Sequence, residues 1–321
     1  MTTSSAEEYL RNQLTSFEMS PGATDALATV YHRRLGRRLW SSLAEQGTPP
    51  AGPDGWRQLT WLHPSVVRMV TTGPIDADAL HAADANGAMY TVAGGPPRPP
   101  LEHLPERDGV PWLEESVRYL EHDIQMVDAA QSLTLSRQLA ESSQPHVDQA
   151  VDVLAHVWPA AAQEFRTLVQ SIAYVDGTVF RSATVEQTYG VIYAAPQSLG
   201  SVAAAFEMLL HETGHHALYL RNSFGPFVLN GSALASHPLR PDPRPIFGVL
   251  HSAHVLARMA TGLHRWTVDA DAPDEAHERR EQALKNLSQS LDVLGREAEW
   301  TTQGIDYFKD LRACEDSLRA A

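Results

Sequence analysis

The strongest constraint on the fold of this chain is an apolar stretch at residues 198–220, whose second half reads LLHETGHHALYL. Hydrophobic residues recur there with the period of an α-helix, and Ser198 is a suitable N-cap. In such a helix His211 and His215 are four positions apart, so both imidazoles project from one face, one turn apart. Two imidazoles in this arrangement can bind one divalent metal ion. The stretch therefore predicts a long helix with a metal-binding face.

Glu212 completes a His-Glu-x-x-His motif, in which the histidines hold a metal and the glutamate acts as a general base on a metal-bound water. The plain alternative is a pair of surface histidines on an amphipathic helix. An expected strand and a Pro-Gln-Ser entry precede the helix, which is the arrangement of zincin-like sites and favours a metal site. His216 points about 100° away from His215 and is expected to pack beside the site.

A metal bound by two histidines needs a third protein ligand. The metzincin extension of the motif requires Gly at position 218 and His at 221, whereas this chain has Leu218 and Arg221. A thermolysin-like site would take a glutamate from a later helix, and Glu275, Glu278 and Glu281 are possible donors. They lie in a charge-dense stretch, which is more typical of a solvated helix face. Cys314 is the only cysteine, so a cysteine-based site and an intrachain disulfide are both excluded.

A better donor lies in the apolar helix expected at residues 246–263. Its ionisable side chains His251, His254 and Arg258 share one face, since His254 is about 60° and Arg258 about 20° from His251 around the helix axis. Burying such groups is costly unless they are paired or bound to a metal. The simpler interpretation is a core histidine whose hydrogen bonds are satisfied within the protein, beside an arginine whose charged end reaches solvent. We expect His251 to be the third ligand and His254 to be the alternative.

Three such ligands leave open positions on the metal. That set suits a hydrolytic zinc ion, and it equally suits Fe(II) that binds a bidentate keto acid and dioxygen. The spacing of the histidines does not choose between the two. A keto acid also needs a cation for its distal carboxylate, and arginine binds a carboxylate through two parallel hydrogen bonds. Arg244 and Arg258 are the candidates.

The rest of the chain predicts an α+β fold that is mainly α. Helical periodicity is expected at residues 25–43, 112–139, 146–169, 275–300 and 305–320. Between 171 and 196 the residues favour strands, with a hairpin turning at Asp176-Gly177 and a third strand ending at Pro196. We therefore expect a helical N-terminal region at 1–150. A zincin-like region at 151–321 follows, with a small sheet next to the metal-binding helix, and the two regions could pack as one domain.

Composition excludes several other classes of protein. The formal net charge of −14 argues against nucleic-acid binding, which requires a basic face. No apolar run approaches the length of a membrane-spanning helix, so no membrane association is expected. The polar, acidic N-terminus lacks the apolar segment of a secretion signal, so a cytoplasmic location is expected.

Three segments of the chain resemble one known family. YGVIYAAP, AAAFEMLLHETGHHALYL and RPDPRPIFGVLHSAHVLA are similar to the HExxH-type, 2-oxoglutarate-dependent peptide β-hydroxylases found beside peptide natural-product genes. The resemblance covers roughly residues 185–265. It includes the Arg-Pro turn at Arg244-Pro245 and the Leu-His pair at Leu250-His251. Ser252 departs from the family, which usually has Gly there.

The resemblance implies Fe(II), 2-oxoglutarate, dioxygen and a ribosomally made precursor peptide as the substrate. His211, His215 and His251 would hold the iron, and Arg244 or Arg258 would pair with the distal carboxylate. Glu212 would then orient ligands or water instead of acting as a base. Two alternatives remain open. One is a zinc peptidase with Glu212 as general base, and the other is a non-catalytic peptide-binding protein with a structural metal.

Overall fold

A computed structural model describes most of the chain, and its residues fold mainly into helices with a small mixed sheet, as predicted. The described residues are 9, 12–45, 59–72, 89–91, 100–105, 110–125, 132–177, 179–237, 239, 241–269 and 271–321. No helix in this part of the chain is both long and apolar enough to cross a membrane.

The chain forms two compact units. Unit 1 comprises Met1–Thr24, Val147–Phe165 and Ser201–Ala321, and unit 2 comprises Asp25–His146 and Arg166–Gly200. The sequence-based division near residue 150 is close to one point where the chain passes between units. Each unit nevertheless combines separate segments, so a single boundary does not describe the organisation.

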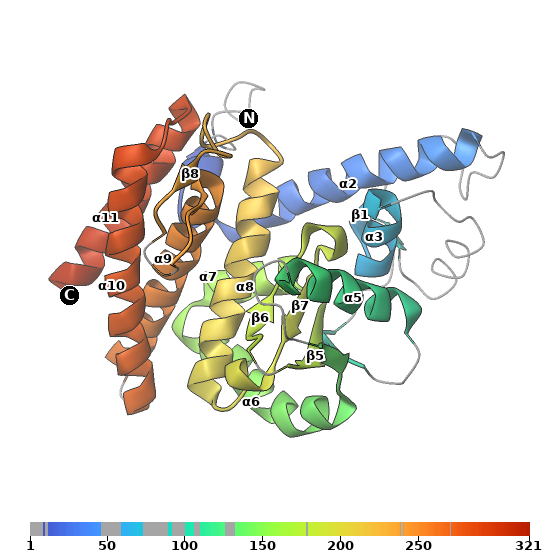
Figure 1. Cartoon of the computed structure of the whole chain (residues 1–321), viewed down its shortest axis with the longest axis horizontal. Coiled ribbons are helices and arrows are strands. Elements are labelled where there is room, and N and C mark those ends of the chain that lie inside the picture. Colours follow the sequence, from blue (N-terminus) through green and yellow to red (C-terminus); the bar gives the residue numbers. More distant parts are fainter. Residues whose placement is uncertain are drawn as a thin grey trace. The chain divides into compact units, whose positions relative to one another are not determined.

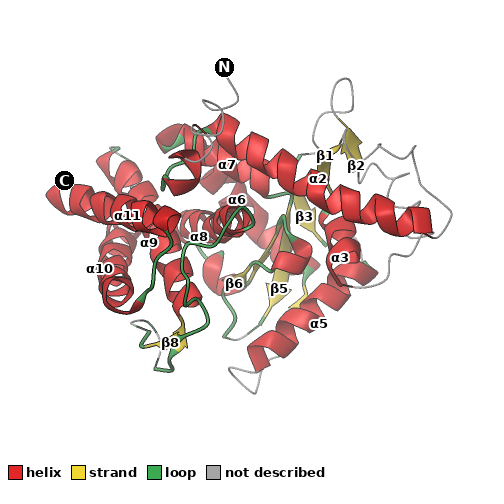
Figure 2. Ribbon diagram, turned by 90° about the horizontal axis from the view of Figure 1, so that it is seen from above, coloured by secondary structure: helices red, strands yellow, loops and turns green. Residues whose placement is uncertain are grey.

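Unit 2 contains the small sheet, whose strands are among those drawn in yellow in Figure 2, and several helices. The helices are α2 (Pro21–Glu45), which starts in unit 1, α3 (Pro64–Thr72) and α5 (Pro111–Gln125). The strands are β1 (Leu59–Leu62), β2 (Met89–Thr91), β3 (Glu102–Leu104), β4 (Thr134–Leu135), β5 (Ser171–Asp176), β6 (Ser182–Ala183) and β7 (Val191–Ala194). The main sheet has the order β3-β5-β7-β6, with β4 paired to β5, and β1 pairs with β2 separately.

The predicted hairpin at Asp176-Gly177 is wrong. β5 runs parallel to β7, with Ile172 opposite Ile192, and β7 separates β5 from β6. β6 pairs antiparallel with β7 instead. The Val-, Ile- and Tyr-rich residues of β5 and β7 are almost fully buried, which is typical of parallel strands covered on both faces. The third predicted strand is confirmed as β7.

The predicted helix at 112–139 is also wrong, because α5 ends at Gln125 and β4 and α6 follow as separate elements. Helix α6 (Arg137–Val157) begins before the predicted start at His146 and contains Pro145. A second helix, α7 (Pro159–Leu168), starts with proline at its first position, where no backbone donor is needed. The predicted helix at 146–169 is therefore two helices.

Unit 1 is built mainly from four long helices. They are α8 (Val202–Asn222), α9 (Ile246–Val268), α10 (Asp274–Glu297) and α11 (Thr302–Ala320). Figure 1 shows α9 packed against α8 and against the α10–α11 pair. Short strands β8 (Leu234–Ala235) and β9 (Arg244–Pro245) pair antiparallel in the α8–α9 connection. All four helices agree with the prediction to within a few residues at each end.

Helix α8 is capped by Ser201, whose hydroxyl accepts a hydrogen bond from the backbone N–H of Ala204. The N-cap predicted at Ser198 is wrong, because Ser198 belongs to a short 3-10 turn and its hydroxyl donates to the carbonyl of Arg181. The chain also passes from unit 2 to unit 1 at this cap, because unit 2 ends at Gly200 and unit 1 resumes at Ser201. The sheet predicted to lie beside the metal-binding helix belongs to unit 2, whereas α8 belongs to unit 1.

Two glycines allow α8 and α9 to pack closely. A Cβ atom at Gly214 would lie 3.0 Å from both Val255 Cγ1 and Arg258 Cδ, and one at Gly262 would lie 2.4 Å from Leu210 Cδ1. Carbon atoms normally approach to about 3.5–4.0 Å. The absence of a side chain at position 214, between the two histidines of the motif, therefore lets α9 lie directly against the motif.

Candidate metal centre

The structure brings together the three histidines that the sequence singles out. The Nε2 atoms of His211 and His215 are 3.1 Å apart, and the Nδ1 atoms of His215 and His251 are 2.9 Å apart. His211 and His215 are on one face of α8, and His251 is on the second turn of α9. All three belong to unit 1. The imidazoles therefore form a continuous chain of contacts across the interface of two helices.

Aromatic side chains surround the third ring. His251 contacts Phe247 edge-on, with ring centroids 4.4 Å apart, and its centroid is 4.9 Å from that of Tyr219. His251 retains 7% exposure, whereas the His211 side chain retains 36%. The cluster is thus closed at His251 and more accessible at His211.

These surroundings hold the imidazoles in the neutral form that binds metals. Burial lowers the pKa of His211 to about 4 and that of His251 to about 3. Burial, followed by repulsion from the neighbouring imidazoles, lowers the pKa of His215 well below its ordinary value. His211 keeps some access to solvent, but the protein packed around it still disfavours its charged form. Near neutral pH each ring therefore has one bare nitrogen, as a metal ligand requires.

The donor set fits an iron or zinc ion, although the three rings do not converge on one point. Two ligand nitrogens about 2.1 Å from a metal would be about 3.0 Å apart at right angles and about 3.4 Å apart in a tetrahedral site, and the His211–His215 distance of 3.1 Å lies between these values. His215 uses its opposite nitrogen toward His251, and among the described residues no three His, Cys, Asp or Glu side chains are arranged as a metal-binding group. The buried Nε2 of His251 has no hydrogen-bond partner there. A turn of the His251 side chain would be needed to complete the set.

Glu212 lies next to the ring that faces solvent. Its side chain is 1% exposed, and its Oε1 atom is 3.9 Å from His211 Nε2. A carboxylate at this distance from a candidate ligand nitrogen can accept a hydrogen bond from a water or other group held beside that nitrogen. The position is compatible with both roles considered for Glu212, general base and orienting group.

The structure places Arg258 and His254 in the helix packing of unit 1. Arg258 forms an ion pair with Glu164, and the two side chains are 1% and 4% exposed. His254 is fully buried, and its Nδ1 atom is hydrogen-bonded to the Tyr307 hydroxyl at 2.5 Å. Arg258 therefore has a carboxylate partner within the protein, which argues against its predicted role with a cosubstrate. The Tyr307 contact occupies only Nδ1 of His254, and its Nε2 is buried without a hydrogen-bond partner among the described residues. The complete burial of His254 argues against its predicted role with a cosubstrate.

Arg244 remains as the candidate for a distal carboxylate. It is half-buried in β9, immediately before α9, and its Nε atom is buried without a hydrogen-bond partner among the described residues. Glu275, an alternative ligand from the sequence, instead accepts hydrogen bonds from Arg279 in a part-buried ion pair. The ion pair of Arg258 with Glu164 favours Arg244 over Arg258 as the partner of a distal carboxylate.

One neighbour of the cluster was missed by sequence reasoning. The Sδ atom of Met259 is 3.3 Å from His211 Nδ1, and the residue is 7% exposed. Nothing in the sequence distinguishes Met259 from an ordinary core methionine of an apolar helix, because its contact partner is in another helix.

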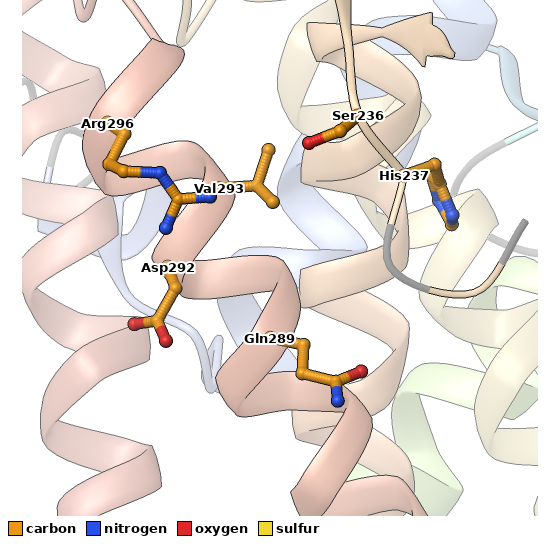
Figure 3. A pocket seen from close by; sticks show the side chains of 6 residues that line it. All are labelled: Ser236, His237, Gln289, Asp292, Val293 and Arg296. Atoms are coloured by element: carbon orange, nitrogen blue, oxygen red, sulfur yellow. The ribbon is translucent and has the colours of Figure 1, made fainter. Parts of the chain in front are cut away.

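Two cavities in unit 1 are lined by other residues. One, of about 300 Å³, is formed by Gln289, Asp292, Val293 and Arg296 of α10 facing Ser236 and His237 (Figure 3). The other, of about 370 Å³, is bordered by Phe17, Arg265, Asp310 and Cys314 with their neighbours. Neither includes a residue of the histidine cluster, so the evidence for the candidate site is the contacts among its side chains and not a cavity.

The chain matches no model of a known protein family, and no curated protein matches it significantly.

Proposed function

We propose that this chain is an Fe(II)- and 2-oxoglutarate-dependent hydroxylase that modifies the β-carbon of a residue in a ribosomally made precursor peptide. The observation that carries the proposal is the contact of three neutral imidazoles, from His211, His215 and His251, across the α8–α9 interface. The resemblance of residues 185–265 to the HExxH-type hydroxylases supports the choice of iron and keto acid over zinc.

In this proposal His211, His215 and His251 would hold the iron, each through one ring nitrogen. Iron with 2-oxoglutarate and dioxygen supplies the oxidation of an unactivated C–H bond. Arg244 pairs with the distal carboxylate of 2-oxoglutarate through its guanidinium. Phe247 and the other rings beside His251 keep water away from the third ligand. Glu212 accepts a hydrogen bond from a group held next to His211 and thereby orients it.

A zinc peptidase is the second candidate, and the position of Glu212 favours it. Its carboxylate is 3.9 Å from His211 Nε2, where it could remove a proton from a metal-bound water. A buried carboxylate beside a ligand is required for peptide hydrolysis, whereas in a hydroxylase it has only a supporting role. Substitution of Glu212 therefore separates the two candidates.

The experiment begins with anaerobic reconstitution by Fe(II), followed by 2-oxoglutarate, oxygen and a candidate precursor peptide. Succinate is measured together with the mass of the peptide. Succinate with one added oxygen on the peptide supports the hydroxylase, and peptide fragments without succinate support the peptidase.

Variants complete this test. Glu212→Gln should abolish a peptidase but leave measurable hydroxylation. His215→Ala should abolish either activity, whereas His277→Ala, which removes an exposed histidine of α10, should change neither. A protein that binds the peptide but yields neither product, with or without metal, would overturn both candidates in favour of a binding protein.

A further inference from the structure

The sulfur of Met259 contacts the first histidine of the motif on the side away from the second. Met259 Sδ is 3.3 Å from His211 Nδ1, and His211 Nε2 is 3.1 Å from His215 Nε2. The imidazole of His211 is therefore held at both nitrogens, by α9 on one side and by its own helix on the other.

The chemistry of the thioether decides which nitrogen carries the proton. A methionine sulfur has no hydrogen, so it can accept a hydrogen bond but cannot donate one. A favourable contact at this distance requires the proton of the neutral His211 ring to be on Nδ1. The Nε2 atom then has a bare lone pair directed toward His215, which is the form that binds a metal.

The same choice propagates along the cluster. In the metal-free protein, with His211 Nε2 bare, His215 can donate from Nε2 and accept at Nδ1, and His251 can donate from Nδ1. Each contact between neighbouring histidines then has one donor and one acceptor, and all three rings are neutral. The nitrogen left bare at the far end is His251 Nε2, the buried atom that has no partner among the described residues. Binding of a metal to His215 Nε2 would require the proton on that nitrogen to move to His215 Nδ1.

We propose that Met259 is a positioning residue that fixes His211 in its Nδ1–H tautomer, so that His211 Nε2 is presented as a ready metal ligand. Metal-binding histidines usually donate their other N–H to a carboxylate or a carbonyl. A thioether holds the same orientation without adding negative charge, which suits a buried site of neutral ligands. The part of the proposal that concerns metal binding rests on the proposed function.

The first measurement uses the metal-free protein. Nitrogen-15 NMR of the imidazoles, with His211 assigned by comparison with His211→Asn, should show the Nδ1–H tautomer in the wild type. Met259→Leu removes the acceptor at nearly constant volume and should shift His211 toward the Nε2–H tautomer. Met259→Gln provides a carbonyl acceptor and should restore the wild-type tautomer. Met208→Leu, a buried methionine of α8, is the matched control and should change nothing.

The second measurement is the affinity for Co(II) and Zn(II) by competition with a chelator. Loss of an outer partner of a ligand weakens metal binding about 10-fold or more, so we expect about a 10-fold loss in Met259→Leu, recovery in Met259→Gln and no change in Met208→Leu. A wild-type His211 in the Nε2–H tautomer, or a Met259→Leu variant with unchanged tautomer and affinity, would overturn the proposal. A wild type that binds neither metal would instead overturn the proposed function, and the tautomer result would still decide the role of Met259.

Discussion

Replacement of Glu164 by glutamine tests whether Arg258 is a structural residue. The two side chains form an ion pair in unit 1 and are 4% and 1% exposed. Breaking a buried pair by removing one partner leaves an uncompensated charge and costs about 3–5 kcal/mol. Glutamine keeps the shape and one acceptor oxygen, so we expect a loss of unfolding free energy at the lower end of this range, about 3 kcal/mol.

This cost corresponds to a large change in thermal stability. For a cooperative unit of 150–250 residues, about 1 kcal/mol shifts the melting temperature by roughly 2–4 °C. Glu164→Gln should therefore lower the transition of unit 1 by about 6–12 °C in differential scanning calorimetry at pH 7. The double variant Glu164→Leu/Arg258→Met removes both charges and should melt close to the wild type, because an apolar pair of similar volume avoids the cost of desolvation.

A matched control is available in the same helix. Arg265 pairs with Glu18 at 2.8 Å, but these side chains are 36% and 41% exposed. Exposed pairs contribute about 0–1 kcal/mol, so Glu18→Gln should lower the transition by no more than about 4 °C. If Glu164→Gln melted within that range, or if the double variant were as unstable as the single one, the assignment of Arg258 to an ion pair that the fold requires would be refuted.

Three further predictions follow from the site and its helices. Arg244→Gln removes a charge-assisted hydrogen bond worth about 1.5–3 kcal/mol and should raise the Kd of 2-oxoglutarate in the Fe(II)-loaded, anaerobic protein about 10- to 100-fold. Metal affinity should not change, and Arg296→Gln on α10 should leave both constants as they are. Burial, with nearby Arg221 and Arg258, lowers the pKa of His254, so the unfolded state binds its proton first and the free energy of unfolding should fall as the pH drops below about 6.5. His254→Gln should flatten that slope by up to about 1.4 kcal/mol per pH unit, and denaturation of the metal-free protein at several pH values measures it. Ser201→Ala should cost about 1 kcal/mol and speed hydrogen exchange at the amide of Ala204.

Each of these has a contradicting result. An unchanged Kd in Arg244→Gln would remove that residue from the proposed cosubstrate site. An identical slope in wild type and His254→Gln would show that His254 does not titrate differently in the two states. Unchanged exchange at Ala204 would mean that the Ser201 hydroxyl does not hold the first turn of α8.

Local patterns in the sequence predicted helices α8–α11 and the histidine motif. Helical periodicity located α8–α11 within a few residues, because an amphipathic helix is specified by neighbours three and four positions apart. The same spacing places His211 and His215 on one face of α8, and the chemistry of three histidines without cysteine limits the choice of metals.

Pairings between distant segments were decided only by the tertiary structure. The parallel pairing of β5 with β7 replaces the predicted hairpin, and β4 interrupts the predicted helix at 112–139, because strand partners are chosen by burial in the whole sheet. Glu164 neutralises Arg258 from a helix far away in the sequence. The contact of Met259 with His211 likewise depends on the close approach of α8 and α9, and the lack of a side chain at Gly214 permits that approach. Such contacts depend on packing in three dimensions, and no local repeat in the chain encodes them.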